Sequence, residues 1–146
     1  MFYVIDAGVA VKWFIPEVDS DIAHQLLARY LQGVDTPMAP DLFIAESGNV
    51  FWRRYRQGDI MPDEATESLA DLLTLNVPLV PATRLVPSAF SLALQYQRTV
   101  YDALYLTLAQ ERNCDVITAD ERFFNALRAQ FPQLQLLRNW QPPAGE

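Results

Sequence analysis

The chain has 146 residues, of which 51% are hydrophobic and 20% are charged, a composition typical of one packed globular domain and not of a disordered or fibrous chain. Eighteen acidic against eleven basic residues give a formal net charge of −7, which excludes a general electrostatic attraction to nucleic acid or to an anionic membrane. The one cysteine, Cys114, excludes an intramolecular disulfide and a multi-cysteine zinc site.

The pattern of apolar residues, prolines and glycines predicts strands that alternate with helices. In chain order we expect a strand at Phe2–Ile5, a helix from Asp19 or Ser20 to Gln32, a short extended piece between Pro37 and Pro40, a helix from Leu42 to about Gln57 capped by Asp41, and a helix from Pro62 to Leu75. There follow a short strand within Val77–Val80, helices from about Pro87 to Gln97 and from Asp102 to Arg112, a strand at Asp115–Thr118, a helix from Glu121 to about Gln130, and a strand at Leu134–Leu137.

This alternation predicts an α/β fold, a three-layer α/β/α sandwich with a short, mainly parallel central sheet. The helix that begins at Asp102 is apolar on nearly every side, as a helix in the middle of a domain is. We expect one domain over residues 1–140 and a flexible C-terminal tail at residues 141–146.

Two features argue against export and membrane insertion. The first apolar run ends at Asp6 and has no basic segment before it, so the N-terminus does not match a signal peptide. No uncharged stretch reaches the roughly 20 apolar residues that a membrane span needs. We therefore expect a soluble cytoplasmic protein with no membrane partner.

Four acids stand at positions where solvation alone does not explain them. Asp6 and Asp120 each follow a predicted strand, and ligand crevices of open α/β sheets form at the carboxyl ends of strands. Glu46 falls within the apolar stripe of its helix, where an unpaired carboxylate is costly. Asp102 begins the most apolar helix of the chain.

Each acid also has a structural interpretation. Asp102 and Asp120 can be helix caps, and Asp6 can end its strand in a turn. Glu46 can pair with Arg53 on the same side of its helix. Taken as a set, four carboxylates without a Cys or His cluster predict a hard oxygen-ligand site that suits Mg²⁺ or Mn²⁺.

Four blocks of sequence resemble the PIN-domain ribonucleases, and within them the VapC-type toxins of toxin–antitoxin pairs. They are VIDAGVAVKWF at residues 4–14, PDLFIAESGNV at 40–50, TVYDALYLTLA at 99–109 and VITADERF at 116–123. The blocks occur in the order and spacing of the family and cover nearly the whole chain. One position departs from the family pattern, because Gly8 stands where a serine or threonine is usual.

The resemblance implies a Mg²⁺- or Mn²⁺-dependent endoribonuclease. Its metal-binding and catalytic acids would be Asp6, Glu46, Asp102 and Asp120, with Thr118 as a supporting residue. The implied partners are an RNA substrate, a cognate VapB-like antitoxin whose segment enters the acidic groove, and a second copy of the chain in a homodimer.

Further residues have two interpretations each. Asn49 lies on the Glu46 side of its helix and is a second supporting candidate. Arg53, Arg54 and Lys12 can bind RNA phosphate, although arginines are also favoured at a helix C-terminus.

Two other functions remain open at this point. A PIN-like module that has lost catalysis would be a protein- or RNA-binding scaffold, and Gly8 is the residue that suggests it. A phosphotransferase or phosphatase would use Asp6 as its nucleophile, but that chemistry normally needs a lysine near the phosphate and Lys12 is the only lysine.

Overall fold

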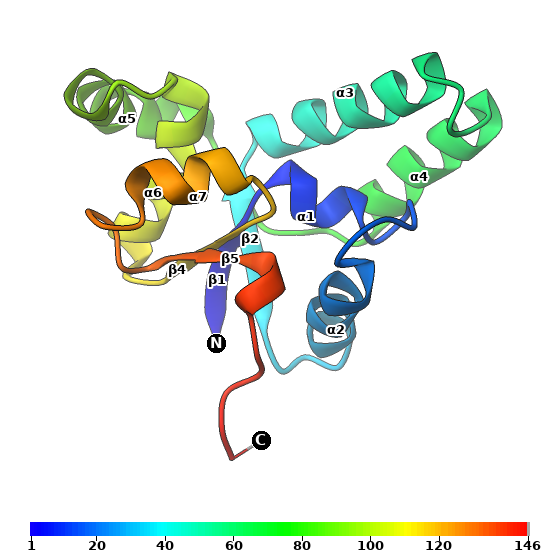
Figure 1. The fold of residues 1–146 in the computed structure, drawn as a ribbon, viewed down its shortest axis with the longest axis horizontal. Coiled ribbons are helices and arrows are strands. Elements are labelled where there is room, and N and C mark those ends of the chain that lie inside the picture. Colours follow the sequence, from blue (N-terminus) through cyan, green and yellow to red (C-terminus); the bar gives the residue numbers. More distant parts are fainter. Residues whose placement is uncertain (146) are drawn as a thin grey trace.

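The computed structural model describes residues 1–145, which form one parallel sheet covered by helices (Figure 1). The strands are β1 (Phe2–Ile5), β2 (Thr36–Pro40), β3 (Leu79–Val80), β4 (Asp115–Thr118) and β5 (Leu134–Leu136). Their order in the sheet is β3-β2-β1-β4-β5, and every neighbouring pair is parallel. The predicted α/β fold with a parallel central sheet is confirmed.

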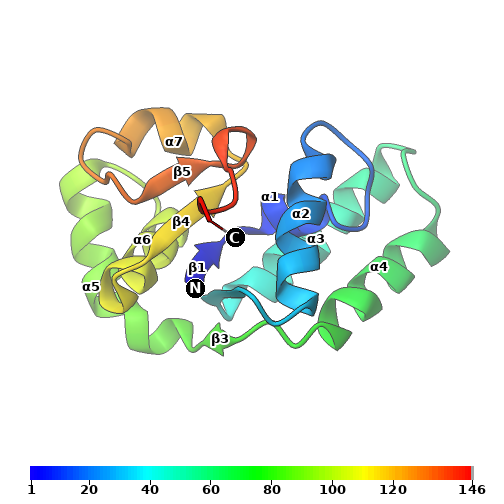
Figure 2. The ribbon, with the colours of Figure 1, turned by 90° about the horizontal axis from the view of Figure 1, so that it is seen from below.

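Helices form a layer on each side of this sheet. They are α1 (Ala7–Val11), α2 (Ser20–Leu31), α3 (Leu42–Arg56), α4 (Pro62–Thr74), α5 (Ala82–Tyr96), α6 (Val100–Arg112) and α7 (Glu121–Leu127), followed by the 3-10 helix η1 (Leu137–Asn139). Figure 2 shows α1 to α4 on one side of the strands and α5 to α7 on the other. This arrangement follows from right-handed crossovers, because the chain first moves outward from β1 to β3 and then returns past β1 to β4 and β5.

The centre of the sheet is a topological switch point. β1 and β4 are neighbours, and Ile5 lies opposite Ile117 in the ladder. The chain leaves β1 toward α1 on one face and leaves β4 toward α7 on the other face. Connections that diverge from adjacent parallel strands leave a crevice at the carboxyl ends of those strands, so the fold opens a ligand site just after Ile5 and Thr118.

The core is densest around α6, which lies between the sheet and α5. All residues from Ala103 to Ala109 are buried, and the facing strand contributes Val4 and Ile5, both with no exposed surface. Each fully buried leucine such as Leu108 contributes about 2 kcal/mol of hydrophobic stabilisation. The prediction of a helix in the middle of the domain is confirmed. No helix within residues 1–145 is long and apolar enough to cross a bilayer.

Helix α5 begins earlier than predicted, and the reason is a contact from a distant part of the chain. The sequence suggested Pro87 as its first residue, but α5 starts at Ala82 and contains Pro87 inside its early turns. The backbone N–H of Ala82 donates to Asp41 Oδ1 at 3.0 Å. Asp41 therefore caps α5, and its side chain makes no capping bond to α3, contrary to the prediction.

One helix was missed and other boundaries differ by a few residues. The missed helix is the short α1, which the side chain of Asp6 caps by accepting from Val9 N. α7 ends at Leu127, before the expected Gln130, and β5 ends at Leu136, where η1 begins. The last element ends at Asn139. The domain limit at residue 140 and the flexible tail remain predictions, and residue 146 of that tail lies outside the described residues.

Candidate functional site

The four acids singled out in the sequence line one cavity. It has a volume of about 360 Å³ and lies at the carboxyl ends of β1 and β4, where the sheet topology opens the crevice. Its lining includes Asp6, Glu46, Asp102 and Asp120, together with Gly8, Lys12, Glu17, Arg53 and Tyr105. Residues from α1, α3, α6 and the turn after β4 thus meet at one point.

Asp6 is fixed at the base of this cavity by donors from two elements. Its carboxylate accepts from Val9 N at 3.0 Å and from Ala119 N at 3.5 Å, and the Thr118 hydroxyl also donates to it. Burial nevertheless raises the pKa of Asp6 to about 6, because these bonds only partly offset the desolvation and the nearby charge of Asp120 opposes ionisation.

Thr118 joins the two acids at the strand ends. It is completely buried, and its hydroxyl oxygen accepts from Asp120 N at 3.0 Å while it donates to Asp6. Asp120 in turn caps α7, because its Oδ1 accepts from Arg122 N at 2.9 Å and from Phe123 N at 3.2 Å. Asp120 is therefore a helix cap and a cavity residue at once, so its two sequence interpretations do not exclude each other.

Glu46 reaches the cavity from α3 and is held by a tyrosine. The Tyr105 hydroxyl donates to Glu46 Oε1 at 3.1 Å. Among the described residues Glu46 forms no ion pair with Arg53, the alternative that the sequence allowed. Burial raises the pKa of Glu46, and the charges of Asp6 and Asp102 raise it further, whereas the bond from Tyr105 lowers it. Tyr105 was missed in the sequence, although it lies one helical turn after Asp102 on the same face.

Asp102 lies in the first turn of α6, two residues later than the helix start. The cap of that helix is Thr99, whose hydroxyl accepts from Asp102 N at 3.1 Å. The Asp102 carboxylate accepts from Arg98 Nη2 at 3.0 Å. Burial raises the pKa of Asp102, and the charge of Arg98 acts in the opposite direction.

The carboxylate oxygens of the cavity suit a hard divalent cation, but the four side chains are not close enough together to bind one without rearrangement. Carboxylate oxygens are the ligands that Mg²⁺ and Mn²⁺ prefer. In the part of the chain that the structure describes, no three Asp, Glu, His or Cys side chains are grouped closely enough to hold an ion as they stand. Three of the carboxylates accept hydrogen bonds from the protein itself: Asp102 from Arg98, Glu46 from Tyr105 and Asp120 from the start of α7.

The basic residues near the cavity fall into two groups. Lys12 lines the cavity but donates to Glu17 at 3.1 Å and to Val18 O at 2.8 Å. Arg54 is paired with Glu17 and with Asp59, so Glu17, which sequence reasoning missed, neutralises two of the predicted phosphate-binding side chains. Arg53 lines the cavity, is exposed, and forms no ion pair with any residue from 1 to 145.

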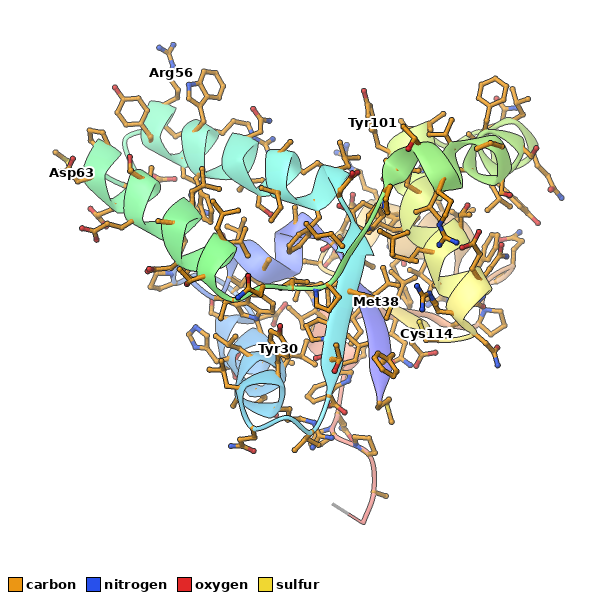
Figure 3. All side chains as sticks on the ribbon, turned by 180° about the vertical axis from the view of Figure 1, so that it is seen from behind. Tyr30, Met38, Arg56, Asp63, Tyr101 and Cys114 are labelled. Atoms are coloured by element: carbon orange, nitrogen blue, oxygen red, sulfur yellow. The ribbon has the colours of Figure 1, made fainter. Side chains whose placement is uncertain are left out.

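Two further residues of α3 lie away from the acids. Asn49 is exposed and does not line the cavity. Arg56, at the far end of α3 (Figure 3), lies over the ring of Trp52 at 5.8 Å. Helix α3 therefore presents only Glu46, Val50 and Arg53 to the cavity.

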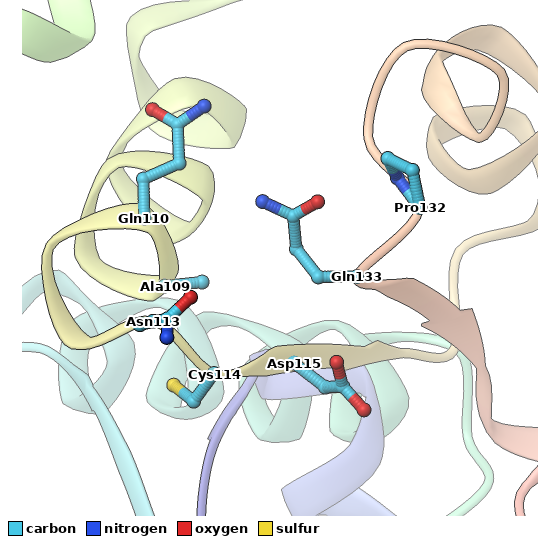
Figure 4. A pocket seen from close by; sticks show the side chains of 7 residues that line it. All are labelled: Ala109, Gln110, Asn113, Cys114, Asp115, Pro132 and Gln133. Atoms are coloured by element: carbon cyan, nitrogen blue, oxygen red, sulfur yellow. The ribbon is translucent and has the colours of Figure 1, made fainter.

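A second cavity, of about 450 Å³, lies at the amino ends of β4 and β5, and Figure 4 shows the side chains that line it. It is lined by amide side chains of Gln110, Asn113 and Gln133, with Cys114 and one carboxylate, Asp115. Asp115 is the first residue of β4, so this cavity is at the amino ends of the strands. With a single carboxylate, this cavity is much less negatively charged than the acid cavity.

Gly8 allows α1 to approach the turn after β4. A Cβ atom at this position would lie 3.1 Å from the Cβ of Ala119 and 3.4 Å from Asp6 Oδ1. Ala119 is held by the bond of its N–H to Asp6 and by its neighbour Thr118, so it has little freedom to move aside. A serine or a threonine at this position would meet the same contact with its Cβ.

We predict that Gly8→Ala costs less folding free energy when Ala119 is replaced by glycine. The coupling between the two sites should be about 1 kcal/mol, because the substitutions share one close contact. Urea unfolding of the parent, the two single variants and the double variant measures it. Additive effects would mean that Ala119 yields to the new methyl group without cost.

We also predict that Asp6 makes the metal-free protein less stable as the pH rises. Because its pKa is raised to about 6, the folded state binds the proton more tightly than the unfolded chain, so the free energy of unfolding falls between the ordinary carboxyl pKa and pH 6. The loss is about 1 to 3 kcal/mol. Urea unfolding in EDTA across this range should show a flatter profile for Asp6→Asn. Parallel profiles would show that Asp6 titrates like an exposed carboxyl.

Comparisons with known proteins agree with this geometry. The PIN domain model matches residues 3–128. Ribonuclease VapC3 of Pyrobaculum aerophilum is 31% identical over 136 residues, which cover 92% of this chain and 98% of that protein. The crystal structure of PAE2754 from Pyrobaculum aerophilum has the same fold, with a TM-score of 0.67 at 20% identity, over 94% of this chain and 93% of that one. This chain therefore belongs to the PIN-domain family and is of the VapC type.

Proposed function

We propose that this protein is a Mg²⁺- or Mn²⁺-dependent endoribonuclease and the toxin of a toxin–antitoxin pair. The observation that carries the proposal is the meeting of Asp6, Glu46, Asp102 and Asp120 in one cavity at the switch point of the sheet. Membership of the PIN-domain family and the likeness to a protein named Ribonuclease VapC3 support it.

In this proposal the four carboxylates are the metal ligands and catalytic residues. A bound divalent cation would lower the pKa of water and stabilise the negative charge of the phosphodiester transition state. Thr118 keeps Asp6 and the start of α7 in fixed relation. Arg53 supplies a cationic donor at the cavity for the RNA phosphate, and unlike Lys12 it is not paired with Glu17. Lys12 and Arg54 would first have to leave Glu17.

The partner that we propose for the free protein is a VapB-like antitoxin. An apolar groove of about 260 Å³ runs between α3 and α4, and its lining includes Trp52, Tyr55 and Leu69. Trp52 is 55% exposed. Helix α3 carries this groove on the side turned away from Glu46, so an antitoxin bound there would reach the acid cavity with a further segment that passes around α3.

A homodimer is the second assembly that we propose. Val86, Phe90 and Leu94 recur at every fourth residue of α5 and are all exposed, and Tyr101 at the start of α6 is 62% exposed. Such a row of large apolar side chains favours contact with another protein surface.

The first test of the proposed activity is metal-dependent cleavage of RNA. The purified protein should cut some members of a mixed set of structured RNAs with Mg²⁺ or Mn²⁺ and none with EDTA. Asp102→Asn should lower the rate about a hundredfold or more, since it removes one charge from the transition-state environment. Asp63→Asn, at the exposed start of α4 (Figure 3), is the matched control and should cut like the parent.

The same experiment separates the alternatives. A scaffold without catalysis would leave every RNA intact and would bind no Mn²⁺ at millimolar concentration in calorimetry. A phosphatase would hydrolyse small phosphate esters and lose that activity in Asp6→Asn. Equal cleavage by the parent and Asp102→Asn would contradict the assignment of the site.

We further predict that Arg53 and Arg54 differ in their effect on RNA binding. Arg53→Gln should raise KM about tenfold with little change in stability, because it removes one charge-assisted contact to phosphate. Arg54→Gln should lower stability by up to about 1 kcal/mol through its lost ion pairs and leave KM nearly unchanged. Steady-state kinetics with one cleaved RNA, together with urea unfolding, decides this. A larger rise of KM in Arg54→Gln would reverse the assignment.

A further inference from the structure

Arg98 is a cation placed against the acid cavity, and the proposed activity assigns it no role. It follows α5 and immediately precedes Thr99, the cap of α6. Its guanidinium donates from Nη2 to Asp102 Oδ2 at 3.0 Å, and only 27% of its side chain is exposed.

The position of Arg98 is unfavourable apart from its pair with Asp102. The N-terminus of a helix carries a partial positive charge that disfavours a cation, and α6 begins two residues after Arg98. The Nε of Arg98 is buried and has no hydrogen-bond partner within the described residues, which is a further cost. The negative charge of the acid cavity is the feature that offsets both effects.

Arg98 also occupies one carboxylate oxygen of Asp102, Oδ2. Asp6, Glu46 and Asp120 line the same cavity, yet the Asp102 carboxylate is bonded to the guanidinium, and the acids do not stand as a cluster ready for an ion. A divalent cation that binds Asp102 must therefore compete with a positive charge that already contacts that carboxylate.

We infer that Arg98 is a built-in counter-ion that competes with the divalent cation for Asp102 and thereby weakens metal binding in the free protein. The inference rests on the proposed metal site. In this inference Arg98 lowers the affinity of the site for the divalent cation without being one of its ligands.

Calorimetric titration with Mn²⁺ at about pH 8, above the raised pKa of Asp6, tests the inference without any activity measurement. Arg98→Gln should bind Mn²⁺ more tightly by on the order of tenfold, since a full charge close to the cation is removed. Arg98→Lys keeps the charge and should bind close to the parent affinity. Arg84→Gln is the matched control, because Arg84, in α5, also donates to an acid of α6, Glu111 at 2.9 Å, but outside the cavity.

The outcomes separate this inference from the proposed function. Tighter binding by Arg98→Gln alone supports the counter-ion. Binding that is unchanged or weaker in a folded Arg98→Gln, with the parent binding normally, overturns it and leaves the metal site in place. Parent protein that binds no Mn²⁺ overturns both. If Arg98→Gln does not fold, Arg98→Lys decides, because an affinity far from that of the parent at unchanged charge would overturn the inference.

Discussion

Negative charge held at the carboxyl end of β1 is the constraint on which the rest of the site depends. Asp6 lies where two adjacent strands send their connections to opposite faces, so no backbone fills the space beside it. Burial raises the pKa of its carboxyl group to about 6. Val9 N, Ala119 N and the Thr118 hydroxyl stabilise the charge in part, and the sheet core beneath keeps these donors in place.

The acids of the site are each stabilised by a local structural role as well. Asp6 caps α1, Asp120 caps α7, and Asp102 lies in the first turn of α6, where a helix dipole favours a carboxylate. Glu46 lies in the middle of α3 and depends on Tyr105 instead. These roles explain how a chain with a net charge of −7 can place four carboxylates around one cavity and still fold. For Asp120 the local interpretation as a cap was correct without excluding a shared site, whereas the cap of α6 is Thr99 and Asp102 follows it in the first turn.

Most elements could be predicted from the sequence because their signals are local. The strand just before Asp6 and the helix that is apolar all round are marked by composition alone, and both were found. The start of α5 could not be predicted, because Asp41, far away in the chain, supplies the cap at Ala82. The partners of the acids escaped prediction in the same way: Tyr105 meets Glu46 across 59 positions of sequence, and Glu17 reaches Arg54 across 37.

The sequence by itself determined the α/β fold and the identities of the four acids, since strand and helix periodicity and four spaced motifs are properties of short segments. Only the tertiary structure decided which groups neutralise one another. It left Arg53 at the cavity, turned Arg54 and Lys12 to Glu17, placed Asn49 on the outside, and set Arg98 against Asp102. The physical reason is that side-chain charge pairs depend on distances of a few ångströms between elements, and those distances exist only after the helices have packed on the sheet.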